Sequence, residues 1–166
     1  MAAPVKTNAL RLLDGARIAY RTLSYTWEEG LFDGELVAGK IGMNPDAVFK
    51  TLVAKGERRG HAVFLVPVSR ELDLKAAASL LKDKKVDLIH VNDLLGLTGY
   101  IRGGCSPVGM KKQFPTYMDE TALLFNEIAV SAGGRGLQMV IDPKALVSFL
   151  HAGTGRLAKE TGADVR

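Results

Sequence analysis

Hydrophobic and polar positions follow two different periods along this chain, and the change of period marks out its elements. Apolar residues spaced three or four positions apart predict helices over residues 9–15, 35–41, 72–81, 91–97 and 142–151. Alternating or continuous apolar runs predict strands over residues 18–25, 47–54, 61–68, 123–131 and 137–141. A charged connection, Lys-Gly-Glu-Arg-Arg-Gly, joins the second and third of these strands, which predicts a hairpin with a charged tip.

Capping residues support several of the predicted helices. Thr7 or Asn8 can cap the first helix, Asn92 can cap the fourth, and Asp142 before Pro143 is a good start signal for the last. Gly42 is placed to stop the second helix.

Strands and helices intermix without a regular βαβ alternation, so we predict an α+β fold around a mixed, curled sheet. The length of 166 residues indicates a single domain with a full hydrophobic core. We expect this domain to span residues 1–153. Residues 154–166 are rich in glycine and polar side chains, and we expect them to form a frayed tail.

Composition narrows the class of protein. Hydrophobic residues make up 47% and charged residues 24% of the chain, which is ordinary for a soluble globular protein. No apolar run is long enough to span a membrane, and the first residues do not resemble a secretory signal. We therefore expect a cytoplasmic protein with no membrane partner. A single cysteine excludes an intrachain disulfide.

The net charge of +4 and the isoelectric point near 9.2 permit contact with a polyanion without requiring it. Cations cluster at Lys55 with Arg58 and Arg59, at Lys82 with Lys84 and Lys85, and at Lys111 with Lys112. Each cluster alone is also typical of a solvated loop or helix end. Aromatic residues do not interleave with these cations, so contact with a phosphate backbone is favoured over base stacking.

Familiar catalytic constellations are missing from the sequence. His61, His90 and His151 lie in different predicted elements and not at metal-ligand spacing, so we expect no metal and no cofactor. Cys105 could act as a nucleophile if Arg102 lowered its pKa, or it could be a small apolar filler in its loop. The filler interpretation is favoured because no histidine is near it in sequence.

Two glycine-rich segments, at residues 98–112 and 131–136, are suited to exposing backbone amides toward an oxygen-rich ligand. Lys50 stands in the otherwise apolar strand 47–54. It either extends its ammonium to solvent or places a cation on the floor of a cleft, and the sequence leaves both open. Together these features indicate an amide-lined pocket that stabilises an oxyanion without a side-chain nucleophile.

The residues that carry this chemistry resemble the YbaK family of bacterial Cys-tRNA(Pro) deacylases, which is similar to the editing domain inserted in prolyl-tRNA synthetases. The resemblance rests on Phe-Lys-Thr-Leu at 49–52, Thr-Gly-Tyr at 98–100, Gly-Gly-Cys-Ser-Pro at 103–107 with Gly109, and Ser-Ala-Gly-Gly-Arg-Gly-Leu at 131–137. These segments occur in the same order as in the family and at spacings compatible with it. The resemblance covers nearly the whole chain.

The resemblance implies that the mixed sheet is barrel-like and flanked by helices. It also implies a hydrolase that clears cysteine wrongly esterified to proline tRNA, with the substrate thiol attacking its own ester. The implied catalytic residues are Lys50, Gly103 and Gly104. The implied substrate-binding residues are Tyr25, Phe32, Ser106, Pro107, Ser131 and Gly133. The implied partners are the CCA end of the mischarged tRNA and prolyl-tRNA synthetase, which would supply tRNA specificity.

Two alternatives remain open at this stage. The same fold could act on another mischarged aminoacyl-tRNA, such as Ala-tRNA(Pro). The chain could also be a non-catalytic module that binds tRNA or a synthetase and has lost the chemistry.

Overall fold

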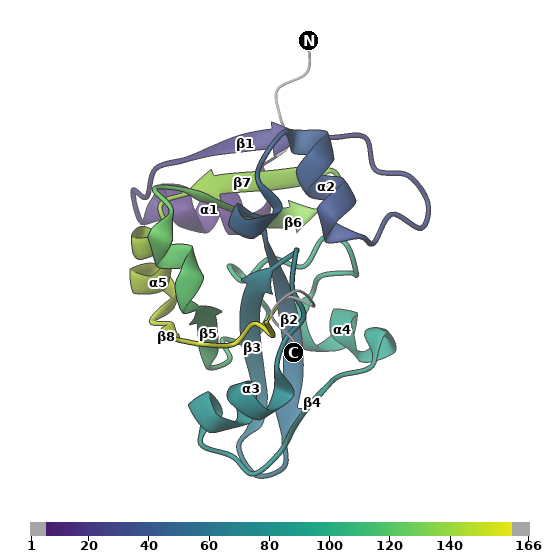
Figure 1. Ribbon diagram of the computed structural model, residues 1–166. Coiled ribbons are helices and arrows are strands. Elements are labelled where there is room, and N and C mark those ends of the chain that lie inside the picture. The colour runs from purple at the N-terminus through teal and green to yellow at the C-terminus, as the bar shows by residue number, and fades with distance from the viewer. Residues whose placement is uncertain (1–5, 161–166) are drawn as a thin grey trace.

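The strands of this chain form two sheets, which are seen in a computed structural model that describes residues 6–160 (Figure 1). The smaller sheet has the order β1-β7-β6 and is antiparallel, with β1 at Tyr20–Ser24, β7 at Leu137–Ile141 and β6 at Ile128–Gly134. The larger sheet has the order β4-β2-β3-β5-β8. Its strands are β4 at Val86–Leu88, β2 at Phe49–Gly56, β3 at Gly60–Pro67, β5 at Thr116–Asp119 and β8 at Gly153–Gly155.

The larger sheet is mixed, because β2 pairs antiparallel with β3 and β4 while β5 runs parallel to β3 and β8. A single bridge between Val48 and Ala129 links the two sheets. The predicted α+β class and mixed sheet are confirmed. The barrel-like closure is corrected, since the two sheets are separate and do not close into a barrel.

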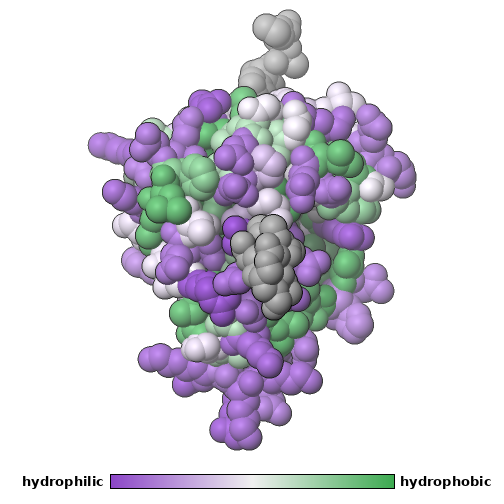
Figure 2. Space-filling view, viewed as in Figure 1, coloured by the Kyte–Doolittle hydropathy of each residue, from purple (hydrophilic) through white to green (hydrophobic). Residues whose placement is uncertain are grey.

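Five α-helices surround the sheets within the described residues: α1 at Asn8–Gly15, α2 at Gly34–Ile41, α3 at Leu74–Leu81, α4 at Val91–Thr98 and α5 at Pro143–Leu150. None of them is long and apolar enough to cross a membrane. The end of the molecule formed by the β2–β3 turn has a hydrophilic surface (Figure 2).

Helix ends follow local capping chemistry, with one exception. The Thr7 hydroxyl accepts a hydrogen bond from the Leu10 N–H at 3.2 Å, and the Asp142 carboxylate accepts one from the Lys144 N–H at 2.8 Å. Gly42 ends α2 in the left-handed conformation, with φ of 71°. The helix predicted over residues 91–97 is confirmed as α4, but its predicted cap is wrong, because His90 rather than Asn92 precedes the helix and makes no side-chain cap.

The predicted strand over residues 123–131 begins later than expected. A 3-10 helix at Glu120–Leu124 occupies its first part, and β6 begins at Ile128. Asp119 caps this short helix by accepting a hydrogen bond from the Thr121 N–H at 3.2 Å. Leu124 is 81% exposed, so its apolar side chain does not mark a core position.

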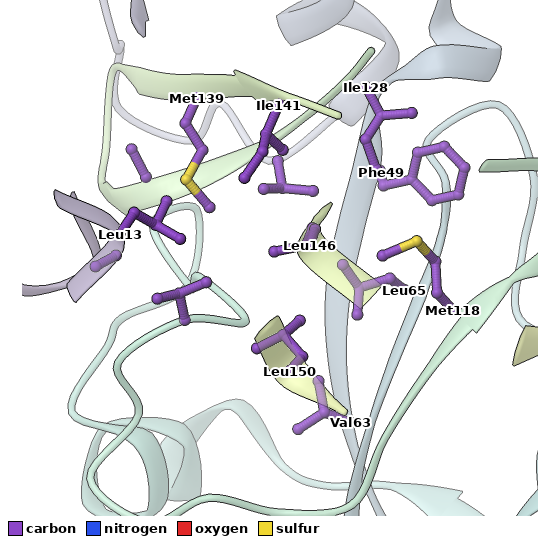
Figure 3. Packing of buried hydrophobic residues seen from close by; sticks show 14 of the residues in the cluster. Leu13, Phe49, Val63, Leu65, Met118, Ile128, Met139, Ile141, Leu146 and Leu150 are labelled. Atoms are coloured by element: carbon purple, nitrogen blue, oxygen red, sulfur yellow. The ribbon is translucent and has the colours of Figure 1, made fainter. Parts of the chain in front are cut away.

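A core of large apolar side chains fills the space between the two sheets and against α1 and α5 (Figure 3). Phe49, Leu65, Met118, Met139 and Leu146 are almost fully buried there. A second cluster, which includes Phe64 and Leu81, lies under α3. Burying each such side chain contributes about 1.5–3 kcal/mol, so the first half of β2 is held firmly in place.

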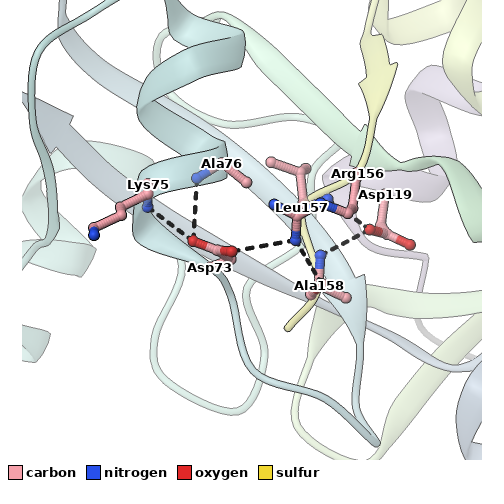
Figure 4. Close-up of polar contacts among 7 residues, drawn as sticks. All are labelled: Asp73, Lys75, Ala76, Asp119, Arg156, Leu157 and Ala158. Carbon is pink, nitrogen blue, oxygen red and sulfur yellow. Dashed lines mark hydrogen bonds and ion pairs between the residues drawn. The ribbon is translucent and has the colours of Figure 1, made fainter. Parts of the chain in front are cut away.

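The segment after α5 is packed rather than frayed. Asp119 accepts hydrogen bonds from the Leu157 N–H at 2.7 Å and the Ala158 N–H at 2.8 Å, and Arg156 pairs with Asp73 at 3.2 Å (Figure 4). The Leu157 side chain is fully buried. The expected tail is therefore ordered through residue 158, and residues 161–166 lie outside the described part of the chain.

Candidate active site

A cavity of about 380 Å³ opens where β2, β6 and β7 meet the loops that precede α2 and follow α4. Five of the nine predicted site residues line it: Tyr25, Phe32, Lys50, Gly103 and Ser131. Segments that are far apart in sequence therefore converge on one hollow, which agrees with the predicted pocket.

Lys50 reaches the cavity from the first half of β2, where it pairs with Val66 of β3. Burial lowers the pKa of its ammonium below the usual 10.5, although Glu71, Glu35 and Asp33 partly oppose the shift. No ion pair to Lys50 is found among residues 6–160. The cation on a cleft floor, rather than a lysine extended to solvent, is the arrangement that the structure supports.

The first glycine loop presents Gly103 to the cavity, with φ of 87°. The Gly104 N–H is already engaged, because it donates to the Ile101 carbonyl at 2.9 Å. A Cβ on Gly104 would lie 3.0 Å from the Arg135 nitrogen, so this glycine lets the two glycine loops pack backbone to backbone. Gly103, and not Gly104, is thus the glycine of this pair that can face a ligand.

Three further predicted residues lie behind the cavity wall. Ser106 is fully buried, and its hydroxyl accepts a hydrogen bond from the Val108 N–H at 3.2 Å. Pro107 is buried beside it. Gly133 has φ of 102° and does not line the cavity. These residues shape the two loops without facing the cavity.

Ser131 opens the second glycine loop and lines the cavity. Its hydroxyl oxygen accepts a hydrogen bond from the Gly133 N–H at 3.2 Å. An accepting hydroxyl still has its own hydrogen to donate. Ser131 can therefore donate to an oxygen of a molecule bound in the cavity.

Cys105 lines the cavity but is not poised as a nucleophile. Burial raises the pKa of its thiol to about 12. The thiolate is the reactive form, and almost none is present at neutral pH. Arg102 does not lower this pKa as the sequence allowed, so the filler interpretation is favoured by the structure.

Sequence reasoning predicted Phe32 but missed the contacts between arginines and aromatic side chains that surround it. The Arg102 guanidinium lies 4.0 Å from the centre of the Phe32 ring, and the Arg135 guanidinium lies 4.1 Å from the Trp27 ring. The Arg135 Nε also donates to the Arg102 carbonyl at 2.9 Å. These contacts fasten the loop before α2 to both glycine loops, and no spacing in the sequence could have shown them.

Gln138 was also missed, although a signal for it existed. It is a polar residue in the apolar strand β7, directly opposite Ser131 in the register. It lines the cavity at 7% exposure, and its Oε1 has no hydrogen-bond partner in the described residues. An orphaned buried acceptor of this kind is available to a bound molecule.

Comparison with known proteins adds to this geometry. The family model of the aminoacyl-tRNA editing domain matches residues 28–149, which include both glycine loops and all the residues that line the cavity except Tyr25. The chain belongs to the aminoacyl-tRNA editing domain family. This membership confirms the resemblance found in the sequence and the predicted class of enzyme, an aminoacyl-tRNA deacylase.

A relative within this family is EbsC of Enterococcus faecalis, named as a Cys-tRNA(Pro)/Cys-tRNA(Cys) deacylase. It is 46% identical over 146 residues, which cover 88% of this chain and 89% of EbsC. A crystal structure described as a trans-editing enzyme for prolyl-tRNA synthetase has a TM-score of 0.78 at 24% identity, covering 95% of this chain and 100% of its own. A hypothetical protein has a TM-score of 0.84 at 19% identity, over 92% and 100% of the two chains. These two structures share the fold of the editing domain.

Proposed function

We propose that this member of the editing domain family removes cysteine from mischarged tRNA(Pro), with the substrate supplying its own nucleophile. The observation that carries the proposal is the state of the cavity's thiol. Cys105 is the one cysteine of the chain, and its pKa of about 12 leaves it protonated. A cavity that holds a cation and hydrogen-bond donors but no activated nucleophile suits a substrate that carries one.

The reaction proceeds in two steps. The substrate thiol attacks the carbonyl carbon of its own ester, the bond from that carbon to the ribose oxygen breaks, and the thiol proton ends on the ribose oxygen. This releases the tRNA and a cyclic cysteine thiolactone. Water then opens the thiolactone to free cysteine, so the sum is hydrolysis of the ester.

Three groups of the cavity have roles in the first step. The Gly103 N–H and the Ser131 hydroxyl donate to the carbonyl oxygen as negative charge develops on it. The Lys50 ammonium binds the terminal adenosine or its phosphate and holds the ester in place. Tyr25 and Phe32 form apolar walls beside the substrate.

The remaining predicted residues hold the two glycine loops in the conformation that forms the site. Gly104 permits the close approach of the two glycine loops, and Ser106, Pro107 and Gly133 fix the turns from which Gly103 and Ser131 project. Selectivity follows from the substrate, because alanyl and prolyl esters lack an internal nucleophile and a seryl hydroxyl is a poorer one at neutral pH.

The specificity for the tRNA body is proposed to come from prolyl-tRNA synthetase acting in trans. The name of EbsC includes both Cys-tRNA(Pro) and Cys-tRNA(Cys), which supports weak intrinsic discrimination between tRNA bodies in this family. The purified protein should deacylate both cysteinyl-tRNAs at similar rates, and added synthetase should favour tRNA(Pro). A strong preference shown by the purified protein alone would contradict this partnership.

Deacylation of a panel of aminoacyl-tRNAs tests the function. The wild-type protein should clear Cys-tRNA(Pro) but neither Ala-tRNA(Pro) nor Pro-tRNA(Pro). Lys50→Ala should lower kcat/KM by about 100-fold, because losing its contact to the terminal adenosine misplaces the ester. Cys105→Ala is the matched control from the same cavity and should keep most activity. Equal turnover by the wild type and Lys50→Ala, or faster clearance of alanine, would overturn the assignment.

A further inference from the structure

Six exposed cations gather at the end of the molecule away from the smaller sheet. They come from the β2–β3 turn and from the loop between α3 and β4, and we refer to them as the basic tip: Lys55, Arg58, Arg59, Lys82, Lys84 and Lys85. Three carboxylates lie in or next to these segments: Glu57 in the turn, Asp83 in the loop and Asp87 in β4. The net charge of the tip is therefore three positive, out of +4 for the whole chain.

The backbone of the basic tip is held rigidly by Asp83. Its carboxylate accepts hydrogen bonds from the N–H groups of Arg58 at 3.0 Å, Arg59 at 2.8 Å and Lys84 at 2.7 Å. The Arg59 Nε donates to the Lys82 carbonyl at 3.3 Å, which joins the two segments again. The one carboxylate at the centre of the tip thus bonds to backbone amides, while the cationic side chains remain exposed.

A groove of about 840 Å³ lies along β4, next to both the basic tip and the cavity. Lys55 and Lys85 of the tip line the groove, and Leu88 and Ile89 line both the groove and the cavity. Gly56, at the end of β2, follows Lys50 by six positions, a distance of about 20 Å at the usual rise of a strand. The unpaired 3′ end of a tRNA can span such a distance.

The groove itself is polar and of mixed charge. Its lining includes His61 and His90, together with Glu57, Asp87 and Asp93. The excess of positive charge therefore lies on the basic tip and not along the groove. This distribution suits a polyanion that is gripped at the tip.

We propose that the basic tip binds the phosphate backbone of the tRNA acceptor stem while the unpaired 3′ end follows the groove into the cavity. The identity of this occupant rests on the proposed function. No aromatic side chain belongs to the tip, so it contacts phosphates rather than stacking on bases. It contributes affinity and orientation without reading the tRNA sequence.

The variant Arg58→Gln/Lys84→Gln tests the proposal, because it removes two charges but keeps the backbone bonds to Asp83. The variant should lower kcat/KM for full-length Cys-tRNA about 10-fold and leave hydrolysis of a cysteinyl ester on a short CCA oligonucleotide unchanged. Its binding to uncharged tRNA should have a salt dependence that is shallower by about 2 in the slope of log K against log salt. The control Arg11→Gln/Lys144→Gln removes two exposed cations from α1 and α5. It should change neither kcat/KM on either substrate nor the salt dependence of tRNA binding.

Equal losses on full-length tRNA and on the oligonucleotide would overturn the proposal, because the variant would then be acting on the cavity. An unchanged salt slope would overturn it too. A loss that occurs only with prolyl-tRNA synthetase present would show instead that the tip docks a protein. Failure of the wild type to hydrolyse either ester would contradict the proposed function, while binding of uncharged tRNA would still test the tip.

Discussion

Burial moves the two most conspicuous polar side chains of the cavity toward their neutral forms. The pKa of the Lys50 ammonium falls, and the pKa of the Cys105 thiol rises to about 12. The consequences differ, because a neutral thiol is inert whereas a partly desolvated ammonium that remains charged binds anions strongly. The same apolar surroundings therefore keep the Cys105 thiol unreactive and strengthen the binding of anions by the Lys50 ammonium.

Lys50→Met should stabilise the fold while lowering kcat/KM for deacylation by about 100-fold, as expected for Lys50→Ala. The folded-state pKa of Lys50 lies below that of the unfolded chain, so its charged form costs stability at neutral pH, and this cost disappears as pH rises past the unfolded value. We expect a gain of about 1 kcal/mol in the free energy of unfolding at pH 7, in line with functional groups held at the expense of stability. The gain should shrink toward pH 11.

Urea denaturation at several pH values measures this effect. Lys144→Met, at an exposed position on α5, is the control and should change stability by less than about 0.5 kcal/mol. A marked loss of stability in Lys50→Met would show that the ammonium has a structural role instead.

Individual residues that line the cavity were predictable where they broke a local pattern. Lys50 stood out as a charge in an apolar strand, and Gly103 and Ser131 stood out in glycine-rich loops. Gly104, Ser106 and Pro107 share those loops but face away from the cavity, because burial on one side of a loop depends on what packs there. The contact between Arg102 and Phe32 depends on chain segments that are distant in sequence.

Among the elements, the two glycine loops act as a pair. Gly104 of the first loop packs against the backbone of Gly134 and Arg135 in the second. The Arg135 side chain then returns to the Arg102 carbonyl. Each loop therefore holds the other in the conformation that presents Gly103 and Ser131 to the cavity.

Gly104→Ala should separate the two loops, because its Cβ would lie 3.0 Å from backbone atoms that cannot easily move. We expect a loss of about 1–3 kcal/mol in stability, typical of overpacking, together with a large loss of activity. Gly134→Ala is the matched control, since a Cβ there meets nothing within 4 Å. Thermal denaturation and deacylation of both variants check this, and equal effects of the two would contradict the loop pairing.

The elements that escaped prediction depend on pairing rather than on their own sequence. β4 has three residues, of which Asp87 and Leu88 are exposed, and it is defined by its ladder with β2. β8 has the sequence Gly-Thr-Gly, which has no strand preference, and it is fixed by parallel pairing with β5. Helices with a cap and a clear apolar period were predicted closely, as α1, α2 and α5 show.

Asp119 ties the segment after α5 to the larger sheet, and it is almost fully buried. Asp119→Ala would leave the N–H groups of Leu157 and Ala158 buried without a partner. We expect a loss of about 2–4 kcal/mol in the free energy of unfolding. Asp142→Ala, at the exposed cap of α5, should cost about 1 kcal/mol. Similar losses in the two variants, measured by urea denaturation, would contradict the role of Asp119.

At the scale of the whole molecule, the larger sheet connects the parts of the proposed enzyme. One end of β2 places Lys50 in the cavity, and the other end carries the basic tip. The core between the sheets fixes the cavity, while the arginine and aromatic contacts close its rim. In the mechanism that we propose, the molecule positions an ester and leaves the attack to the substrate.

The most direct test of this account compares Cys-tRNA(Pro) with the same tRNA carrying S-methylcysteine. Methylation removes the nucleophile and adds one carbon, and a rapid quench with mass spectrometry identifies the first product released. The account predicts that the cysteinyl ester yields a thiolactone before free cysteine and that the S-methyl ester is not cleaved above the uncatalysed rate. Comparable cleavage of both esters, or free cysteine as the first product, would contradict it.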